Sequence, residues 1–484
     1  MEMQNVIALL VALITILNIL FAIVVIFVER RDVSSTWAWL MVLFFLPIVG
    51  FFVYIFLGRQ LKQRNFYQLA EEERNFLNDA VNIQLEQLTS SDFNEKPLLK
   101  EHADLITMNM KSSNALLTDD NEVTIFQHGR DKFESLFEDI QNAKKEINLE
   151  YYIIQRDSLG KRLRDELTKK AKEGVRVRVL YDEVGSRRMD RSFFKELIDS
   201  GGEVEVFFPS FLKLINFRFN TRNHRKLCII DGEMAYIGGF NIGNEYLGLN
   251  KKFGNWRDTH LKITGDAVTH IQGRFVLDWK QATKQEIIDY EAYSISEERN
   301  NGSSAIQIIS SGPNSMTEHL KNMYLKLIMS AKRSVYIQTP YFVPDSSFMD
   351  VCKMALLSGV DVRIMIPNKP DHPFVRWANL AYAGELLPYG AKILLYDNGF
   401  LHAKSIVVDQ EVASVGTTNI DLRSFRLNFE VNALIYDEKI ARNLYDLFLE
   451  DSQDSVELTL EQYKERSGTV RFKESISRLL SPIL

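Results

Sequence analysis

The chain has 484 residues, too many for one ordinary domain and enough for two or three. Its composition, with 46% hydrophobic and 25% charged residues, is globular and excludes a disordered chain. The formal net charge of −6 does not favour polyanion binding. The two cysteines, Cys228 and Cys352, exclude a disulfide scaffold or a cysteine-rich zinc module.

Two long uncharged runs open the chain. Residues 5–28 contain 24 residues without a charge, and residues 37–58 contain another 22. About 20 apolar residues span a bilayer, so each run is long enough. A buried core helix is an alternative, and so is a signal peptide, although the small-residue cleavage site of a signal peptide is missing. We predict a two-helix transmembrane hairpin within residues 1–60, in contact with the lipid bilayer.

Cations beside the two spans predict how the hairpin is oriented. Arg30 and Arg31 lie in the turn, whereas Arg59, Lys62 and Arg64 follow the second span. Because positive charge gathers on the cytoplasmic side, three cations against two predict a multi-pass cell-membrane protein with cytoplasmic catalytic domains.

The remaining chain is acidic. Without residues 1–65 it holds 53 basic and 61 acidic residues, a balance of −8. A nucleic-acid binder would more often be basic, so we expect no nucleic-acid partner. Residues 61–120 show helical spacing, for example at Phe76, Ala80 and Ile83. We interpret them as a juxtamembrane helix and linker, with a solvated spacer as the alternative.

From residue 121 onward the chain repeats one series of strands and helices. The first half has expected strands at 123–127, 147–154, 174–179 and 202–206, and the second half at 305–310, 335–343, 359–364 and 390–394. Strands that alternate with helices predict an α/β fold with a parallel or mixed sheet in each half. We assign residues 121–300 and 301–484 to two repeated domains. A C-terminal helix within residues 471–484, with Phe472, Ile476, Leu479 and Leu480 on one face, ends the second domain. We expect it to dock on the body, with the bilayer as the alternative.

The first half carries about ten extra residues. Ile147 and Val335 are 188 residues apart, but His224 and His402 only 178, which places the insert within residues 210–223. Its apolar residues alternate with cations, so it is either a core strand or an exposed lip that meets lipid. The candidate lipid contacts are Phe211, Leu212, Leu214, Ile215 and Phe217.

The repeat contains one motif of chemical interest, H-x-K-x(4)-D. The first copy holds His224, Lys226 and Asp231, and the second holds His402, Lys404 and Asp409. Residues two apart on a strand share a face, so histidine and lysine point together. An ammonium can hold the anionic oxygens of a phosphate while the imidazole attacks or transfers a proton.

Duplication makes this motif informative, because a single His–Lys pair on a strand is more often incidental. Asn241 and Asn419 each lie seventeen residues after the motif histidine, so the two copies also agree beyond the motif. No metal-ligand spacing such as HExxH or CxxC occurs, and neither a P-loop nor a dinucleotide fingerprint occurs. We therefore expect phosphoryl chemistry between two histidines, without a metal or a cofactor.

The duplicated motif resembles that of the phospholipase D superfamily. The N-terminal hairpin with residues 29–32 and 34–39, and the segments 255–260, 340–345 and 423–430, resemble those of bacterial cardiolipin synthases. The resemblance implies that two molecules of phosphatidylglycerol become cardiolipin and glycerol, without a nucleotide-activated lipid. It also implies that the two domains pack around one active site.

The resemblance further implies a role for each motif residue. His224 attacks phosphorus to form a phosphatidyl-histidine, while His402 donates and then accepts a proton. Lys226, Lys404, Asn241 and Asn419 hold the non-bridging oxygens. Glu430, 28 residues after His402, and Asp258, 34 after His224, orient the imidazoles. Asp231 and Asp409 belong to the catalytic motifs, and we expect them to brace the backbone.

Other functions share these motifs. A membrane phospholipase D differs only in using water as acceptor, and other phosphatidyltransferases use serine or another small alcohol. A nuclease of the same superfamily is disfavoured by the acidic balance and the hairpin. A non-catalytic scaffold would be expected to have lost a histidine or lysine from the motifs, and all four are present.

Overall fold

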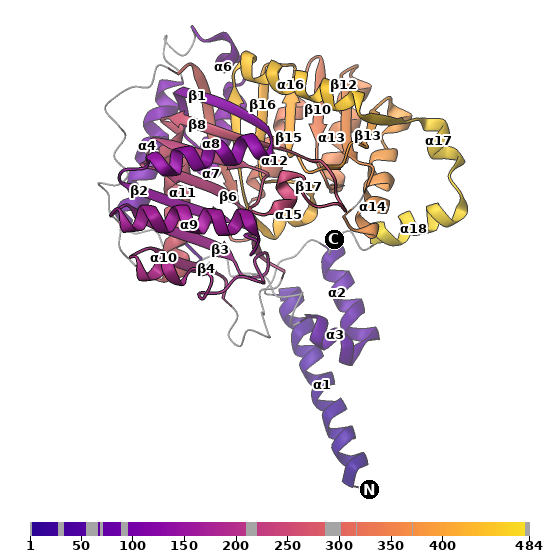
Figure 1. The fold of residues 1–484 in the computed structure, drawn as a ribbon. Helices are drawn as coiled ribbons and strands as arrows, with labels where there is room; N and C mark the ends of the chain where they lie inside the picture. Colours follow the sequence, from indigo (N-terminus) through magenta and orange to yellow (C-terminus); the bar gives the residue numbers. More distant parts are fainter. Residues whose placement is uncertain are drawn as a thin grey trace.

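The computed structural model describes residues 2–27, 33–54, 66–67, 71–88, 95–209, 220–285, 302–315, 317–369 and 371–479. Figure 1 shows a broad body made of two halves and a narrow stalk of three helices that projects from one end of it. The candidate lipid contacts of the insert, Phe211, Leu212, Leu214, Ile215 and Phe217, lie outside the described residues.

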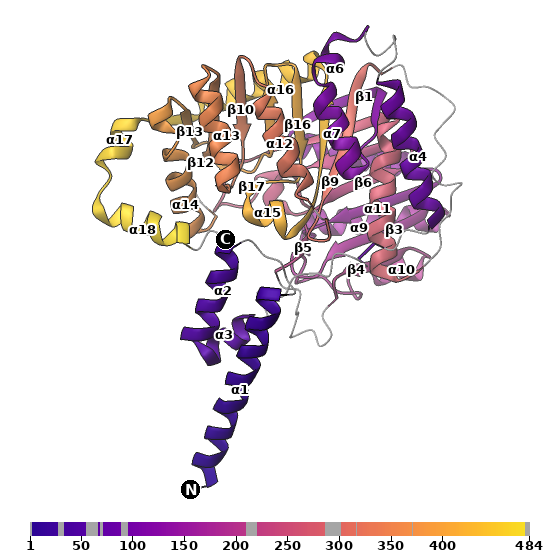
Figure 2. The same ribbon diagram turned by 180° about the vertical axis from the view of Figure 1, so that it is seen from behind.

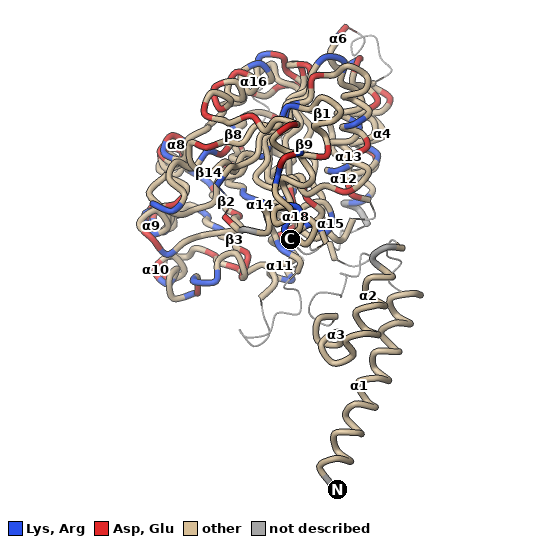
Figure 3. The backbone as a smooth tube through the Cα atoms, turned by 90° about the vertical axis from the view of Figure 1, so that its right-hand side faces the viewer, with Lys and Arg blue, Asp and Glu red and all other residues tan. Residues whose placement is uncertain are grey.

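The first uncharged run forms helix α1 (Glu2–Phe27). By length and composition it is the one helix among the described residues that could cross a membrane. In Figure 3 its tube carries no charge colour from Met3 to Phe27. Apolar side chains are exposed all round it, including Leu9 at 72%, as expected of a helix surrounded by lipid.

The second run is not one continuous helix. It contains α2 (Val33–Phe45) and α3 (Pro47–Val53), which meet at Leu46–Pro47 because proline lacks the N–H that would continue the helix. Helix α3 folds back on α2, so that a Cβ on Gly50 would lie 2.5 Å from the carbonyl oxygen of Val42. The Asn18 amide of α1 donates to the Pro47 carbonyl at 2.7 Å. The predicted span over 37–58 is therefore broken, and its last residues, 55–58, lie outside the described residues.

The body contains a mixed β-sheet that runs through both halves. The first half contributes β1 (Leu117–His128), β2 (Glu146–Tyr151), β3 (Arg176–Asp182), β4 (Glu203–Phe207), β6 (Lys226–Ile230), β7 (Met234–Gly238) and β8 (Trp256–Gly265). The second contributes β9 (Ser304–Ser311), β10 (Ser334–Gln338), β12 (Asp361–Pro367), β13 (Lys392–Tyr396), β15 (Ser405–Val408), β16 (Val412–Gly416), β18 (Asn428–Tyr436) and β19 (Ser455–Leu458).

The strand order confirms the predicted repeat. The first half runs β4-β3-β2-β6-β7-β8-β1, and the second runs β13-β12-β10-β15-β16-β18-β9 in the same sense. In each half the first three strands are parallel and the others pair antiparallel. Strands β1 and β9 pair with each other, so the two halves share one continuous sheet. Asn121 strengthens this junction by donating to the Ser304 carbonyl at 2.9 Å.

Helices cover both faces of the sheet (Figure 2). They are α8 (Gly129–Asn142), α9 (Ser158–Lys172), α10 (Lys195–Asp199) and α11 (Ala267–Thr283) in the first half, and α12 (His319–Met329), α13 (Ser346–Leu357), α14 (Pro373–Gly384) and α16 (Glu438–Gln453) in the second. Phe275 of α11 and Leu444 of α16 belong to one buried cluster with strand residues of both halves. This shared core fixes the halves relative to each other.

Residues N-terminal to the repeat join the second half. Helix α4 (Glu71–Gln87) is followed by α6 (Pro97–Glu101) and α7 (Ala103–Ser113). Leu105, Ile106 and Met110 of α7 are buried in the same cluster as residues of α12. Asn109 donates to the side-chain oxygen of Gln307 at 3.0 Å. Helix α7 is therefore part of a core, and not a solvated spacer.

Candidate active site

Both motifs lie where a short strand crosses from one half to the other. β5 (Arg222–Asn223) pairs in parallel with β18, and β14 (Phe400–Leu401) pairs in parallel with β8. The His224 N–H then donates to the Phe429 carbonyl at 2.9 Å, and the His402 N–H to the Arg257 carbonyl at 2.7 Å. Each His–Lys pair thus sits at the junction of a crossing strand and a sheet strand, with the histidine backbone anchored on the other half.

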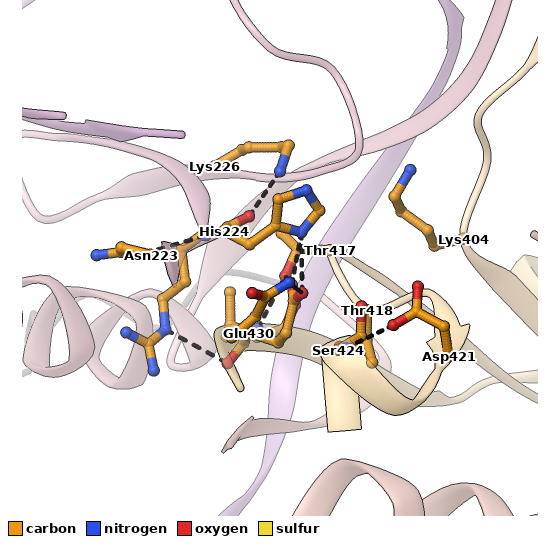
Figure 4. A network of polar contacts seen from close by, with 12 residues as sticks. Asn223, His224, Lys226, Lys404, Thr417, Thr418, Asp421, Ser424 and Glu430 are labelled. Atoms are coloured by element: carbon orange, nitrogen blue, oxygen red, sulfur yellow. Dashed lines mark hydrogen bonds and ion pairs between the residues drawn. The ribbon is translucent and has the colours of Figure 1, made fainter. Parts of the chain in front are cut away.

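The orienting carboxylates are exchanged between the halves. Glu430 of the second half lies 3.0 Å from Nδ1 of His224, as Figure 4 shows. Asp258 of the first half lies 2.6 Å from Nδ1 of His402. In the sequence, each carboxylate was located by its spacing from the histidine of its own half. In the structure, each carboxylate contacts the histidine of the other half. Neither half can therefore assemble a complete histidine–carboxylate pair alone.

The two carboxylates are supported differently. Glu430 accepts from the Thr417 hydroxyl at 2.5 Å and from the Asn428 amide at 3.2 Å. Asp258 lies against Gly239, the first-half counterpart of Thr417, where a Cβ would lie 1.8 Å from its Oδ1. The absent side chain at position 239 makes room for the Asp258 carboxylate.

The motif lysines are buried beside the histidines. Lys226 Nζ donates to the His224 carbonyl at 2.6 Å, and Lys404 Nζ donates to the His402 carbonyl and lies 2.9 Å from His402 Nδ1. In Figure 4 Lys226 lies directly beside the ring of His224, and Lys404 lies farther away on another side of it. Burial lowers the pKa of Lys226 to about 7 and that of Lys404 to about 8. A phosphate between them would favour the charged form of both.

Burial also keeps both imidazoles neutral at pH 7. It lowers the pKa of His224 to about 4, although Glu430 opposes the shift. Burial and the Lys404 ammonium lower the pKa of His402 to about 3 against the effect of Asp258. With Nδ1–H donated to a carboxylate, the lone pair of each neutral ring is on Nε2, which is the atom that can attack or accept a proton.

The predicted asparagines differ in their contacts. Asn241 Oδ1 accepts from the Ile153 N–H at 3.1 Å, which ties the amide to the segment that directly follows β2. Asn419 is 4% exposed, and its Oδ1 has no hydrogen-bond partner among the described residues. Their role as donors to phosphate oxygens stays a prediction.

The motif aspartates lie at the far ends of β6 and β15 from the histidines. Asp231 accepts from the backbone N–H groups of residues 144, 145 and 146 at 2.7–2.9 Å. Asp409 accepts from those of residues 332, 333 and 334 at 2.7–2.8 Å. Both carboxylates therefore bind backbone and brace the start of β2 or β10, as expected from the sequence, and their grouping with the catalytic side chains stays a prediction.

Sequence reasoning missed two buried arginines behind the site. Arg225 pairs with Asp278 at 2.6 Å and donates to the Glu430 carbonyl at 3.3 Å. Arg257 pairs with Asp451 at 2.8 Å and donates to the Asp258 carbonyl. Each arginine thus holds the backbone of an orienting carboxylate. The aspartate partners lie 53 and 194 residues away, so no local pattern could reveal them.

A group of metal-ligand type lies apart from this site. Among the described residues, Glu101, His102 and Glu411 place their ligand atoms within 4.8 Å of one another. Lys332 lies 2.6 Å from Glu101, and Arg333 lies 2.7 Å from Glu411. Two cations already balance the two carboxylates, so we assign no metal to this group.

Comparison with protein families agrees with this geometry. Residues 136–275 and 324–452 match the family described as cardiolipin synthase, PLD-like domain. Residues 16–59 match the phospholipase D-nuclease N-terminal family. The second match covers the C-terminal part of α1 together with α2 and α3, and with the apolar α1 it agrees with a membrane-anchored protein.

Similar proteins extend over the whole chain. The chain is 54% identical over 479 residues to the major cardiolipin synthase ClsA of Bacillus subtilis (strain 168), covering 99% of each chain. It is 52% identical over 482 residues to a cardiolipin synthase of Listeria monocytogenes serotype 4a (strain HCC23), covering 99% of this chain and 100% of that one. A phosphatidylserine synthase structure from Haemophilus influenzae Rd KW20 has a similar fold, with a TM-score of 0.58 at 16% identity over 79% of this chain and 100% of that one.

The shifted lysines predict that anion binding depends on pH. In the free protein Lys226 and Lys404 lose their protons near pH 7 and 8, so an anion bound at higher pH must recruit protons. Dimethyl phosphate keeps a single charge over this pH range. For each lysine that must regain its proton, its affinity should fall by up to about tenfold per pH unit between pH 7 and 9. Titration calorimetry would measure it. Lys404→Arg, which stays charged, should flatten the profile, whereas a flat wild-type profile would contradict the prediction.

Proposed function

The chain belongs to the cardiolipin synthase family of the phospholipase D superfamily, and we propose that it transfers a phosphatidyl group from one phosphatidylglycerol to another. The products are cardiolipin and glycerol. The observation that carries this proposal is the site itself, in which two neutral histidines, each oriented by a carboxylate of the other half, lie beside two buried lysines. Relatives 52–54% identical over nearly the whole chain support it.

In the first step, Nε2 of His224 attacks the phosphorus of the donor lipid. The bond between phosphorus and the glycerol headgroup oxygen breaks as the phosphorus–nitrogen bond forms. His402 takes up one proton from solvent at Nε2 when the phosphodiester anion binds, and it gives that proton to the departing oxygen. The Asp258 carboxylate and the bound phosphodiester anion both favour the protonated form of His402, against burial and Lys404.

In the second step, His402 takes back a proton, now from a glycerol hydroxyl of the second phosphatidylglycerol. That oxygen attacks phosphorus, the bond to His224 breaks, and cardiolipin leaves a neutral His224 behind. Lys226 and Lys404 balance the negative charge on the non-bridging oxygens during both displacements. This charge is greatest in the transition state. Asn419, which is buried and whose Oδ1 has no hydrogen-bond partner among the described residues, is proposed to donate its N–H₂ group to the same oxygens.

The catalytic halves are proposed to lie on the cytoplasmic side of a multi-pass anchor. The cations that follow the second apolar run support this orientation. The two native cysteines are fully buried, so a thiol reagent should label only a cysteine that is introduced on the surface.

The first prediction of this proposal concerns the nucleophile. His224→Ala should lower the formation of cardiolipin and glycerol from purified phosphatidylglycerol by at least about 10²-fold, because the covalent step is lost. Labelled lipid should be trapped on His224 of the wild-type protein. His128→Ala, at an exposed histidine, is the control and should keep full activity.

Three outcomes would contradict parts of this scheme. Full activity of His224→Ala would overturn the mechanism, and a trapped adduct on His402 would reverse the two roles. Phosphatidic acid in place of cardiolipin would make water the acceptor.

The second prediction separates the two exchanged carboxylates. Glu430→Gln should slow adduct formation, because it misorients His224, whereas Asp258→Asn should slow both proton transfers through His402. Each loss in kcat should be about 10²–10⁴-fold. Rapid-quench measurement of the adduct and of released glycerol distinguishes them, and adduct formation at the wild-type rate in Glu430→Gln would refute the assignment.

The third prediction concerns orientation. Lys161→Cys, on the exposed face of α9, should stay unlabelled when a membrane-impermeant thiol reagent is applied to intact cells, and should react after permeabilisation. Leu357→Cys, exposed on α13, is a second reporter that should behave identically. Labelling of both in intact cells would place the body outside.

A further inference from the structure

The C-terminal helix α18 (Gly468–Leu479) has its apolar side turned outward. Phe472, Ile476 and Leu479 follow helical spacing on one face and are 67%, 37% and 77% exposed. Glu474 and Ser477 lie on another face and are only 4% and 0% exposed. A surface helix of a soluble body normally buries the apolar face, so this pattern requires an apolar environment outside the body.

Polar contacts hold α18 in this orientation. Glu474 pairs with Arg466 at 2.7 Å, and Arg478 pairs with Glu385 at the end of α14. Lys473 Nζ lies 5.2 Å from the ring of Trp377 on α14. The outward stripe is therefore set by the contacts of α18 with the body and does not depend on a partner.

The neighbouring helix α14, which packs against α18, also carries aromatic residues. Phe374, 42% exposed, lies three residues before Trp377 and so on the same side of that helix. We call Phe374, Trp377, Phe472, Ile476 and Leu479 the α14–α18 surface. Tryptophan and phenylalanine are typical of the interface between lipid and water.

The charge beside this surface is positive. Arg471 and Lys473 are exposed, and within the described part of the chain no carboxylate lies within ion-pair distance of either. Apolar residues flanked by cations that no described carboxylate neutralises suit a bilayer with anionic headgroups better than an acidic or apolar protein groove.

The α14–α18 surface also lies at the right end of the body. Figure 1 shows α18 at the end of the body from which the stalk projects. Helix α14 starts just after Asp371, whose charge acts on Lys404 of the site and whose carboxylate accepts from Tyr341. The surface therefore lies at the end of the body that carries the stalk, on a helix that begins near the active site.

We propose that the α14–α18 surface docks on the surface of an anionic bilayer, with Phe472, Ile476 and Leu479 inserted among the lipids. Docking holds the site end of the body against the bilayer from which both lipid substrates come, so the stalk anchors the chain while α18 fixes the tilt of the body. This inference goes beyond the proposed reaction and stands on the exposure and charge of α18 alone.

The test uses the full-length protein in vesicles and a fluorescent thiol probe. Leu479→Cys labelled with an environment-sensitive dye should shift its emission to the blue and lose most of its fluorescence when the vesicles carry brominated acyl chains. The shift should weaken when phosphatidylglycerol in the vesicles is replaced by phosphatidylcholine. The native cysteines are fully buried and stay unlabelled.

The matched control is Leu357→Cys, which is 74% exposed at the end of α13, next to the start of β12 and away from the site. Its dye should remain in water and escape the brominated lipids. Equal quenching at both positions, or none at position 479, would overturn the proposal. A disulfide between two copies of the Leu479→Cys protein, without lipid quenching, would instead assign the surface to a second copy of the chain.

Activity gives an independent readout. Phe472→Ser combined with Leu479→Ser should raise KM for phosphatidylglycerol in vesicles roughly tenfold, through loss of inserted apolar area, and leave kcat unchanged. Turnover of a short-chain phosphatidylglycerol dissolved as monomers should not change. A fall in kcat on both substrates would refute a docking role, whereas loss of the catalytic chemistry itself would appear in His224→Ala and not here.

Discussion

Each imidazole of the site depends on a carboxylate that the other half of the chain provides. His224 is held by Glu430 and His402 by Asp258, at 3.0 and 2.6 Å. Hydrogen bonds of this length survive only if the halves keep their relative position to a fraction of an ångström. The junction of β1 and β9, the crossing strands β5 and β14, and the core shared by α11 and α16 all serve that requirement. The repeat is thus two copies in sequence and one unit in function.

Burial supplies the chemistry of this unit as well as its shape. Taking the groups out of water lowers the pKa values of both histidines and both lysines, because the neutral forms need no solvation. The lysines of the free site therefore lose their protons near pH 7 and 8, and a bound phosphodiester anion favours the charged form of both.

The features of the protein that suit a membrane lie at one end of the body. The stalk leaves the body at the end where α18 lies, and α14, which packs against α18, begins just after Asp371, whose charge acts on Lys404. An enzyme that acts on lipids has to bring only the phosphodiester of the headgroup into its site, while the acyl chains can stay in the bilayer. A body held close to the headgroups shortens the distance over which the phosphodiester must move. Polar contacts such as Arg466–Glu474 keep the helix turned outward without lipid.

The sequence by itself determined the strands, the repeat, the motif residues and the reaction class, because alternation of strands and helices and fixed spacings are local properties. It placed Glu430 and Asp258 in the site but not with their true partners. The exchange of carboxylates, the arginine–aspartate pairs behind them and the outward face of α18 were decided by tertiary structure. Each depends on groups far apart in the chain, such as Arg257 and Asp451, whose separation of 194 residues leaves no periodic trace. The packing of the two halves sets the distances between these side chains. Those distances cannot be inferred from the spacing of the residues along the chain.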